Sequence, residues 1–301
     1  MMNFGIQWWI WFNVALFALL AIDLKLVANR TRRMSYILTG IWISIAILFA
    51  IFIYFTKGHQ LALEFVTGYL IEESLSVDNL FVFLMLFHHF HVPQRWQTKI
   101  LMYGIIGALA MRFMFIVGGI AIIQQAHWVM QIFGAFLVFT GIMMFKKTDE
   151  KSLPKESFIV KLVKKVFPYK DSWDQNTFFV TSHGKRFATP AFITLCAVES
   201  TDLVFALDSI PAVFAITLDP FIVYSCNALA IVGLRSLFFV LKDALMLFEH
   251  LHHGVSIILV FVGSKMLIEP VYHIDTLVSL GVIGTILAIS LAIPSTKKKD
   301  L

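Results

Sequence analysis

Residues 64–90 read EFVTGYLIEESLSVDNLFVFLMLFHHF, an apolar segment with Glu72, Glu73 and Asp78 in its interior. About 20 apolar residues are enough for a helix to cross a hydrocarbon core of roughly 30 Å. An acid at the middle of the membrane costs about 2.5 to 3.5 kcal/mol, so acids there need a partner or a task. The segment therefore predicts a membrane-spanning helix with a polar, functional centre.

The whole chain has the composition of a membrane protein. Of its 301 residues, 59% are hydrophobic and 14% are charged, and Phe alone contributes 30. A soluble fold would expose most of this apolar surface to water, so the lipid bilayer is the expected surroundings. The net charge of +5 lies mostly in short segments between apolar runs. Membrane orientation explains such a distribution, and no nucleic-acid partner is expected.

Nine apolar runs are separated by charged residues or by Pro and Gly. They cover residues 6–27, 36–56, 64–90, 99–124, 127–146, 188–216, 219–241, 249–268 and 274–293. We therefore predict an all-α polytopic membrane protein with about nine transmembrane helices. The predicted division is spans one to five in residues 1–146, a basic cytoplasmic connection in 147–187, and spans six to nine in 188–301.

Basic residues gather in alternate connections. Three arginines follow the first run, and Lys is frequent in residues 147–187 and in the C-terminal tail. The positive-inside rule then places the N-terminus outside and the C-terminus in the cytoplasm. Within the long connection, residues 157–169 are basic and amphipathic, which favours a position on anionic headgroups, and residues 178–187 resemble a short strand.

The sixth run carries a second set of acids. Glu199, Asp202 and Asp208 lie inside it, followed by Ser209 and Pro211. Proline cannot donate a hydrogen bond to the preceding turn, which favours a break in the helix just after Asp208. We therefore expect interrupted helices around the acids.

Each acid-bearing run is followed by a run with one arginine. Asp78 precedes Arg112 by 34 residues, and Asp202 precedes Arg235 by 33. Spans three to five and six to eight are therefore predicted to be two copies of a three-helix unit. Because three is odd, the second copy enters the membrane from the opposite side, as in many transporters that hold substrate near the midplane.

The central acids offer only oxygen ligands. No Cys or His lies between the acids of either run, which favours Mn2+, Ca2+ or Mg2+ over Cu+ or Zn2+. Five acids against two arginines leave an excess of three negative charges. Desolvation and like-charge repulsion favour protonated carboxyls in an empty site, so exchange of protons for metal is a natural hypothesis.

Histidine and cysteine give weaker signals. The two cysteines form no CxxC pair, so neither a disulfide framework nor a thiolate metal site is predicted. Two histidine clusters at the predicted inner boundary fit either interface residence or a patch that loads metal or senses pH. These clusters are His88, His89 and His91, and His250, His252 and His253.

Motifs that contain polar residues are dispersed along nearly the whole chain. They include GYLIE at 68–72, SLSVDNLFV at 74–82, FALDSIPA at 205–212, DPFI at 219–222, GLR at 233–235 and KMLI at 265–268. In these motifs the chain resembles the TerC family of bacterial integral membrane proteins, most closely its Alx branch, within the LysE-like transporter group.

The resemblance implies export of Mn2+ across the bacterial inner membrane, which protects the cell from manganese overload. The metal ligands that it implies are Glu72, Asp78, Glu199, Asp202 and Asp208, with Asn79 and Ser209 as neighbours. Arg112 and Arg235 are the expected charge partners. Glu73 is not part of the family pattern. The Alx branch has been described as a redox modulator, but the sequence has no organic-cofactor motif and no paired cysteine.

Three other functions remain open from the sequence. Arg and Asp can pair only to hold helices together, although the surplus of acids argues against this. A non-transporting membrane metal sensor or scaffold, acting in tellurium or pH stress, would use the same residues and bind partners through residues 147–187. A membrane enzyme is not predicted, because no nucleophile or substrate-polarising group is evident.

Overall fold

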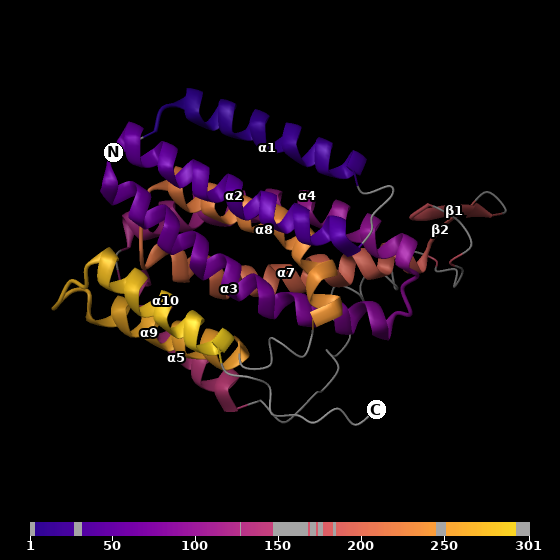
Figure 1. The fold of residues 1–301 in the computed structure, drawn as a ribbon. Helices are drawn as coiled ribbons and strands as arrows, with labels where there is room; N and C mark the ends of the chain where they lie inside the picture. The colour runs from indigo at the N-terminus through magenta and orange to yellow at the C-terminus, as the bar shows by residue number, and fades with distance from the viewer. Residues whose placement is uncertain are drawn as a thin grey trace.

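The structure is a computed structural model that describes residues 4–26, 32–126, 128–146, 168, 173, 177–182, 185–244 and 251–292. Nine α-helices lie in this part of the chain (Figure 1). They are α1 (Ile6–Leu26), α2 (Arg32–Lys57), α3 (His59–His89), α4 (Gln94–Gln125), α5 (Val129–Lys146), α7 (Pro190–Phe214), α8 (Pro220–Ala244), α9 (Leu251–Ile268) and α10 (Thr276–Ala292). Each helix matches one predicted apolar run, so the all-helical prediction is confirmed.

Within the described ranges, the strands β1 (Phe179–Ser182) and β2 (Lys185–Ala188) form one antiparallel hairpin. Phe179 pairs with Ala188, and the hairpin coincides with the predicted strand-like passage. It leads directly into α7. The predicted amphipathic stretch at 157–169 lies outside the described residues, apart from Pro168.

The lengths and compositions of the helices fit a bilayer. Among the described residues, α1, α2, α4, α7 and α8 are long and apolar enough to cross a membrane, while α5, α9 and α10 contain shorter apolar segments. Large apolar side chains point away from the bundle, and Trp11, Phe55 and Met114 are 72%, 79% and 70% exposed. Such apolar surface is unfavourable in water but compatible with lipid.

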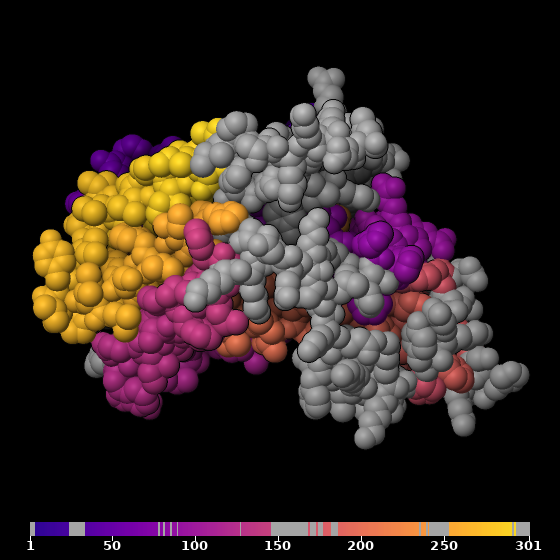
Figure 2. All heavy atoms as spheres, turned by 90° about the horizontal axis from the view of Figure 1, so that it is seen from below, coloured from indigo at the N-terminus to yellow at the C-terminus, as the bar shows by residue number. Residues whose placement is uncertain are grey.

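Helices from the two parts of the chain interleave. α3 packs against α8, α4 packs against α7, and α5 packs against α9. In addition, α3 contacts α9, and α5 contacts α7. Figure 2 shows α9 and α10, in orange to yellow, beside α5 in magenta on one face. α1 makes only slight contact with α8 and lies along one side of the bundle (Figure 1).

α5 and α9 approach each other through a glycine seam, formed by Gly134, Gly141, Ser256 and Gly263. A Cβ atom added at Gly263 would lie 2.6 Å from the carbonyl oxygen of Gly134. One added at Gly141 would lie 2.8 Å from the carbonyl oxygen of Ser256. Because the two contacts run in opposite sequence directions, the helices are antiparallel. Small residues allow this close backbone approach between membrane helices.

The predicted break after Asp208 is wrong. α7 continues through Pro211 and ends at Phe214, and α3 is also continuous. Pro211 removes only the hydrogen bond to the carbonyl of the residue four positions earlier. It lies near the end of α7, and residues 209–214 are buried against neighbouring helices, so packing preserves the helix. The hydroxyl of Ser74 donates to the carbonyl of Ile71 at 2.7 Å within the intact α3.

Candidate functional site

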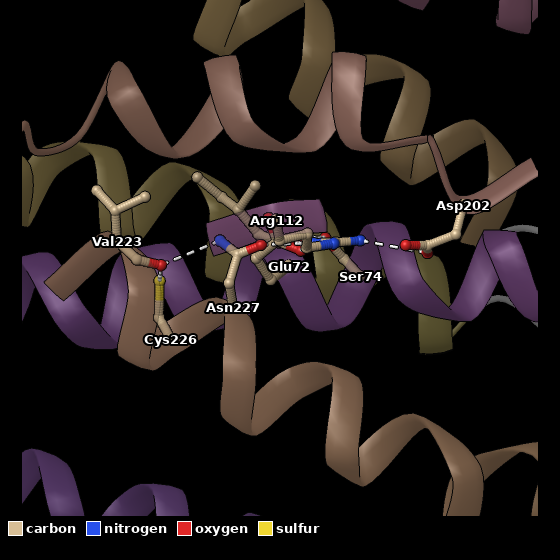
Figure 3. A network of polar contacts seen from close by, with 8 residues as sticks. Glu72, Ser74, Arg112, Asp202, Val223, Cys226 and Asn227 are labelled. Carbon is tan, nitrogen blue, oxygen red and sulfur yellow. Dashed lines mark hydrogen bonds and ion pairs between the residues drawn. The ribbon is translucent and has the colours of Figure 1, made fainter. Parts of the chain in front are cut away.

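Arg112 of α4 lies at the centre of a buried polar network between four helices (Figure 3). Its Nη1 donates to Oε2 of Glu72 on α3 and to Oδ1 of Asn227 on α8, both at 2.5 Å. Its Nη2 lies 3.7 Å from Oδ1 of Asp202 on α7. The side chains of Arg112, Glu72 and Asp202 are only 2%, 0% and 7% exposed. One cation thus faces an acid from each half of the chain.

The three charged residues of this network lie near the middle of α3, α4 and α7. Asp202 is twelve residues from either end of α7, which is about 18 Å at 1.5 Å per residue. An unpaired arginine at such a depth is costly in a bilayer, and two acids nearby compensate its charge. The arrangement therefore holds charged groups at mid-helix without leaving Arg112 alone.

Several buried polar atoms of this region have no hydrogen-bond partner in the part of the chain that the structure describes. They are Oε1 of Glu72, Oε2 of Glu73, Nε of Arg112, Oδ2 of Asp202 and Oγ of Ser209. Native proteins leave few buried polar atoms unpaired, and those that remain call for an explanation such as a bound ion or a functional role. The two acids of the network therefore retain acceptor capacity.

A small cavity adjoins Asp202. Its volume is about 20 Å³, which is enough for one water molecule. Glu199 and Asp202 line it together, because residues three apart share a face of a helix. Gly104 of α4 lines the opposite wall, and a Cβ at Gly107 would lie 2.6 Å from Cδ of Glu199. The two glycines thus leave space for the Glu199 side chain.

Two further acids have partners of their own. Asp208 lies six residues beyond Asp202 on α7 and accepts a hydrogen bond from Thr140 of α5. Glu73 accepts a hydrogen bond from Tyr69, four residues earlier on α3. Adjacent helix positions differ by about 100° in direction, so Glu73 does not share the orientation of Glu72.

For the remaining predicted site residues, the structure gives the burial of two and only the position along the helix of two others. Asn79 and Ser209 are buried. Asp78 and Arg235 lie on α3 and α8, but their side chains are outside the described part of the structure. Among the side chains that are described, no three from His, Cys, Asp and Glu lie close enough together to hold a metal ion. The structure thus brings together Glu72, Arg112 and Asp202, with Glu199 beside them.

The histidine clusters are also partly described. The rings of His88 and His91 stack at 6.3 Å between centroids, at the end of α3. His253 lies edge-on to the ring of Phe145 at 5.4 Å. His250, and the side chains of His89 and His252, are outside the described residues.

Sequence reasoning missed Asn227 and Thr140. Asn227 is the only amide in the apolar run 219–241, and an amide in such a run is a signal that could have found it. Its Nδ2 donates to the carbonyl of Val223 at 3.1 Å, which leaves Oδ1 to accept from Arg112. Thr140 had no comparable signal, because isolated threonines are common in membrane helices.

A much larger cavity, of about 1440 Å³, opens where α1 begins and α4 ends. Phe113, which lines it, is adjacent to Arg112 in sequence, so the cavity reaches the depth of the network. Asn13, also in its wall, accepts a hydrogen bond from the hydroxyl of Tyr224 at 2.6 Å. Its polar lining residues are Asn13, Gln60, Glu64, Gln124, Thr217 and Asp219.

Comparison with known proteins identifies the family. Residues 56–300 match the family described as "Integral membrane protein TerC family". The chain is 42% identical over 298 residues to the "Putative membrane-bound redox modulator Alx" of Escherichia coli strain K12, covering 95% of this chain and 93% of that one. It is 38% identical over 295 residues to an uncharacterised membrane protein of Myxococcus xanthus, covering 97% and 92%. No solved structure matches.

The family match covers more than half of the chain and includes all the helices that form the Arg112 network. The resemblance predicted from dispersed motifs is therefore confirmed, together with its Alx-like relatives. This chain belongs to the TerC family of integral, multi-pass membrane proteins.

Proposed function

We propose that this protein exports a hard divalent cation, Mn2+ in preference to Ca2+ or Mg2+, from the cytoplasm across the bacterial inner membrane in exchange for protons. The observation that carries the proposal is the network in which Glu72 and Asp202, one from each half of the chain, share Arg112. Within the described part of the chain, each acid keeps one buried oxygen without a hydrogen-bond partner. Carboxylate oxygens suit hard cations.

The proposed ligands are the acids of the two acid-bearing helices. Glu72, Asp202 and Glu199 supply oxygens at the network and its small cavity, and Asp78 and Asp208 lie further along α3 and α7. Asn79 and Ser209 are proposed as neutral neighbours. Arg112 and Arg235 are proposed as the charge partners.

An inverted repeat of α3–α5 and α7–α9 is part of the proposal. In this repeat α3, α4 and α5 correspond to α7, α8 and α9, and the helix contacts occur in matching pairs. The contact of α3 with α8 corresponds to that of α7 with α4, and the contact of α3 with α9 corresponds to that of α7 with α5. The glycine seam has the same reciprocity. The same 122 residues separate Gly134 from Ser256 and Gly141 from Gly263, so exchanging the two copies converts one contact into the other. Repeats of this kind hold substrate at their interface.

We propose that the N-terminus is outside and the C-terminus is in the cytoplasm, as the distribution of Lys and Arg favours. The large cavity then lies toward the outside, since Phe4 and Gln124, which line it, are at the ends of α1 and α4 that this orientation places outside. It extends to the depth of Arg112. We therefore propose it as the exit path of the cation.

The exit path predicts access of water to Val117, which lines the cavity. In a chain whose two native cysteines are replaced by alanine, Val117→Cys should react with a membrane-impermeant thiol reagent added outside. Its rate should exceed that of Phe139→Cys by at least about tenfold, because a thiol in lipid does not ionise. Phe139 is 60% exposed on α5 and does not line the cavity. Equal rates would contradict an aqueous path.

Export itself is tested by Mn2+ efflux from cells or oriented vesicles, with Ca2+ and Mg2+ as competitors. Asp208→Asn removes one proposed ligand charge at nearly constant shape and should reduce the flux by at least about tenfold. Asp275→Asn is the matched control, because Asp275 is exposed and caps α10, a role that Asn also fills.

The efflux experiment has three informative outcomes. Loss of flux in Asp208→Asn, with normal membrane insertion and an active control, supports the exporter. Wild-type flux no greater than that of empty membrane, with Mn2+ still bound, would favour the sensor or scaffold. A wild-type flux that ignores an imposed pH gradient would remove proton exchange but keep export.

A further inference from the structure

One nitrogen of the Arg112 guanidinium donates hydrogen bonds to two different kinds of acceptor. Nη1 donates at 2.5 Å both to the charged Oε2 of Glu72 and to the neutral Oδ1 of Asn227. The contact with Asp202 is longer, at 3.7 Å between Nη2 and Oδ1, which exceeds hydrogen-bond distance. In Figure 3, Asn227 and Asp202 lie on opposite sides of the guanidinium.

From this geometry we propose that Arg112 is a tethered counter-cation that competes with the transported metal. Without metal, its guanidinium compensates the charges of Glu72 and Asp202. When a divalent cation binds between these acids, the guanidinium withdraws to Asn227. The proposal rests on the proposed function, because it explains how the same site binds and releases its substrate.

The unpaired oxygens indicate where the cation would bind. Oε1 of Glu72 and Oδ2 of Asp202 are buried and have no hydrogen-bond partner in the described structure. The small cavity beside Asp202 also receives Glu199 and has room for one small species. A dication there would add positive charge close to Arg112, and like charges repel. The guanidinium therefore has to leave the acids.

Asn227 is suited to receive the displaced guanidinium. It is 1% exposed, and its Nδ2 is held by the carbonyl of Val223 at 3.1 Å. Its Oδ1 therefore already points at Nη1. A neutral acceptor satisfies an N–H group of Arg112 without adding a negative charge that would hold the arginine permanently. Arginine keeps its charge at any physiological pH, so this compensation needs no proton.

If Arg112 and the metal compete for the two acids, substitutions of Arg112 and of its acceptor Asn227 should change the affinity for Mn2+ in opposite directions. Arg112→Gln removes the competing charge, so purified protein should bind Mn2+ at least about tenfold more tightly, a factor equal to 1.4 kcal/mol. Asn227→Leu removes the neutral acceptor and keeps Arg112 on the acids, so binding should weaken by about threefold or more. Arg95→Gln is the matched control, because Arg95 is exposed and lies far from the network.

Binding is measured by the electron paramagnetic resonance of free Mn2+ during titration of the purified protein. Tighter binding by Arg112→Gln together with weaker binding by Asn227→Leu supports the proposal. Equal or weaker binding by Arg112→Gln, beside normal wild-type binding, overturns it and leaves the proposed function intact. No binding by the wild type to Mn2+, Ca2+ or Mg2+ overturns both.

Stability supplies a second readout if Arg112→Gln folds poorly. A tethered counter-cation predicts that Mn2+ added during purification restores folded protein, because the dication replaces the missing charge between Glu72 and Asp202. A purely structural arginine predicts no rescue by Mn2+. Absence of rescue, together with unchanged Mn2+ binding by Asn227→Leu, would contradict the proposal.

Discussion

Glu72→Gln is expected to lower the melting temperature of the purified protein strongly and to abolish Mn2+ efflux. Glu72 is fully buried and is the only acid within hydrogen-bond distance of Arg112 among the described residues. Its replacement leaves a buried guanidinium with Asp202 at 3.7 Å as the nearest described counter-charge. Removing one partner of a buried ion pair costs about 3 to 5 kcal/mol. The measurement is thermal unfolding in detergent, followed by efflux.

Two further variants distinguish this electrostatic cause from general damage. Glu269→Gln makes the same chemical change at a side chain that is 41% exposed and pairs with His273, so its melting temperature should stay near that of the wild type. The double variant Glu72→Gln with Arg112→Gln removes both charges and should be more stable than Glu72→Gln alone. Additive losses in the double variant would show that the two charges are not coupled.

Gly263→Leu is expected to prevent correct packing of α5 against α9. The new Cβ would lie 2.6 Å from the carbonyl oxygen of Gly134 and 2.8 Å from the amide nitrogen of Val138. Both are backbone atoms, which cannot rotate away as a side chain could. Overpacking commonly costs about 1 to 3 kcal/mol, and a backbone clash should exceed that range. We expect aggregation in size-exclusion chromatography and rapid proteolysis.

The control for this variant is Gly118→Leu on α4. Gly118 is exposed, and an added Cβ would meet nothing within 4 Å. The same substitution there adds an apolar side chain to an apolar exterior and should be tolerated. A stable, monodisperse Gly263→Leu protein would mean that α5 and α9 do not depend on the glycine seam.

The helices could be predicted from the sequence because the bilayer imposes a length and an apolar composition on each span. The predicted run 188–216 and the observed helix Pro190–Phe214 illustrate the agreement. The sequence also predicted a short strand-like passage in residues 178–187, where the structure has the hairpin of β1 and β2. These features depend on local sequence and on the solvent.

Contacts between distant helices could not be predicted in the same way. Pro211 favours a break in an isolated helix, but the burial of residues 209–214 outweighs that preference. The sequence suggested that Arg112 was a charge partner, yet it did not specify Glu72 rather than another acid. The lone amide of Asn227 is a signal of a polar contact, but it does not say which residue it meets. Pairing across 115 residues is decided by the packing of whole helices.

The Arg112 network also has a consequence for how the protein is made. Glu72 and Arg112 belong to the part of the chain that is synthesised first, and they already form an ion pair with each other. Asp202 and Asn227 are synthesised later and meet Arg112 only when α7 and α8 dock. Arg112 can thus enter the bilayer with an acid partner from its own part of the chain, before α7 and α8 are present. The order of these residues along the chain therefore gives the buried arginine a counter-charge from the earliest stage at which its helix is complete.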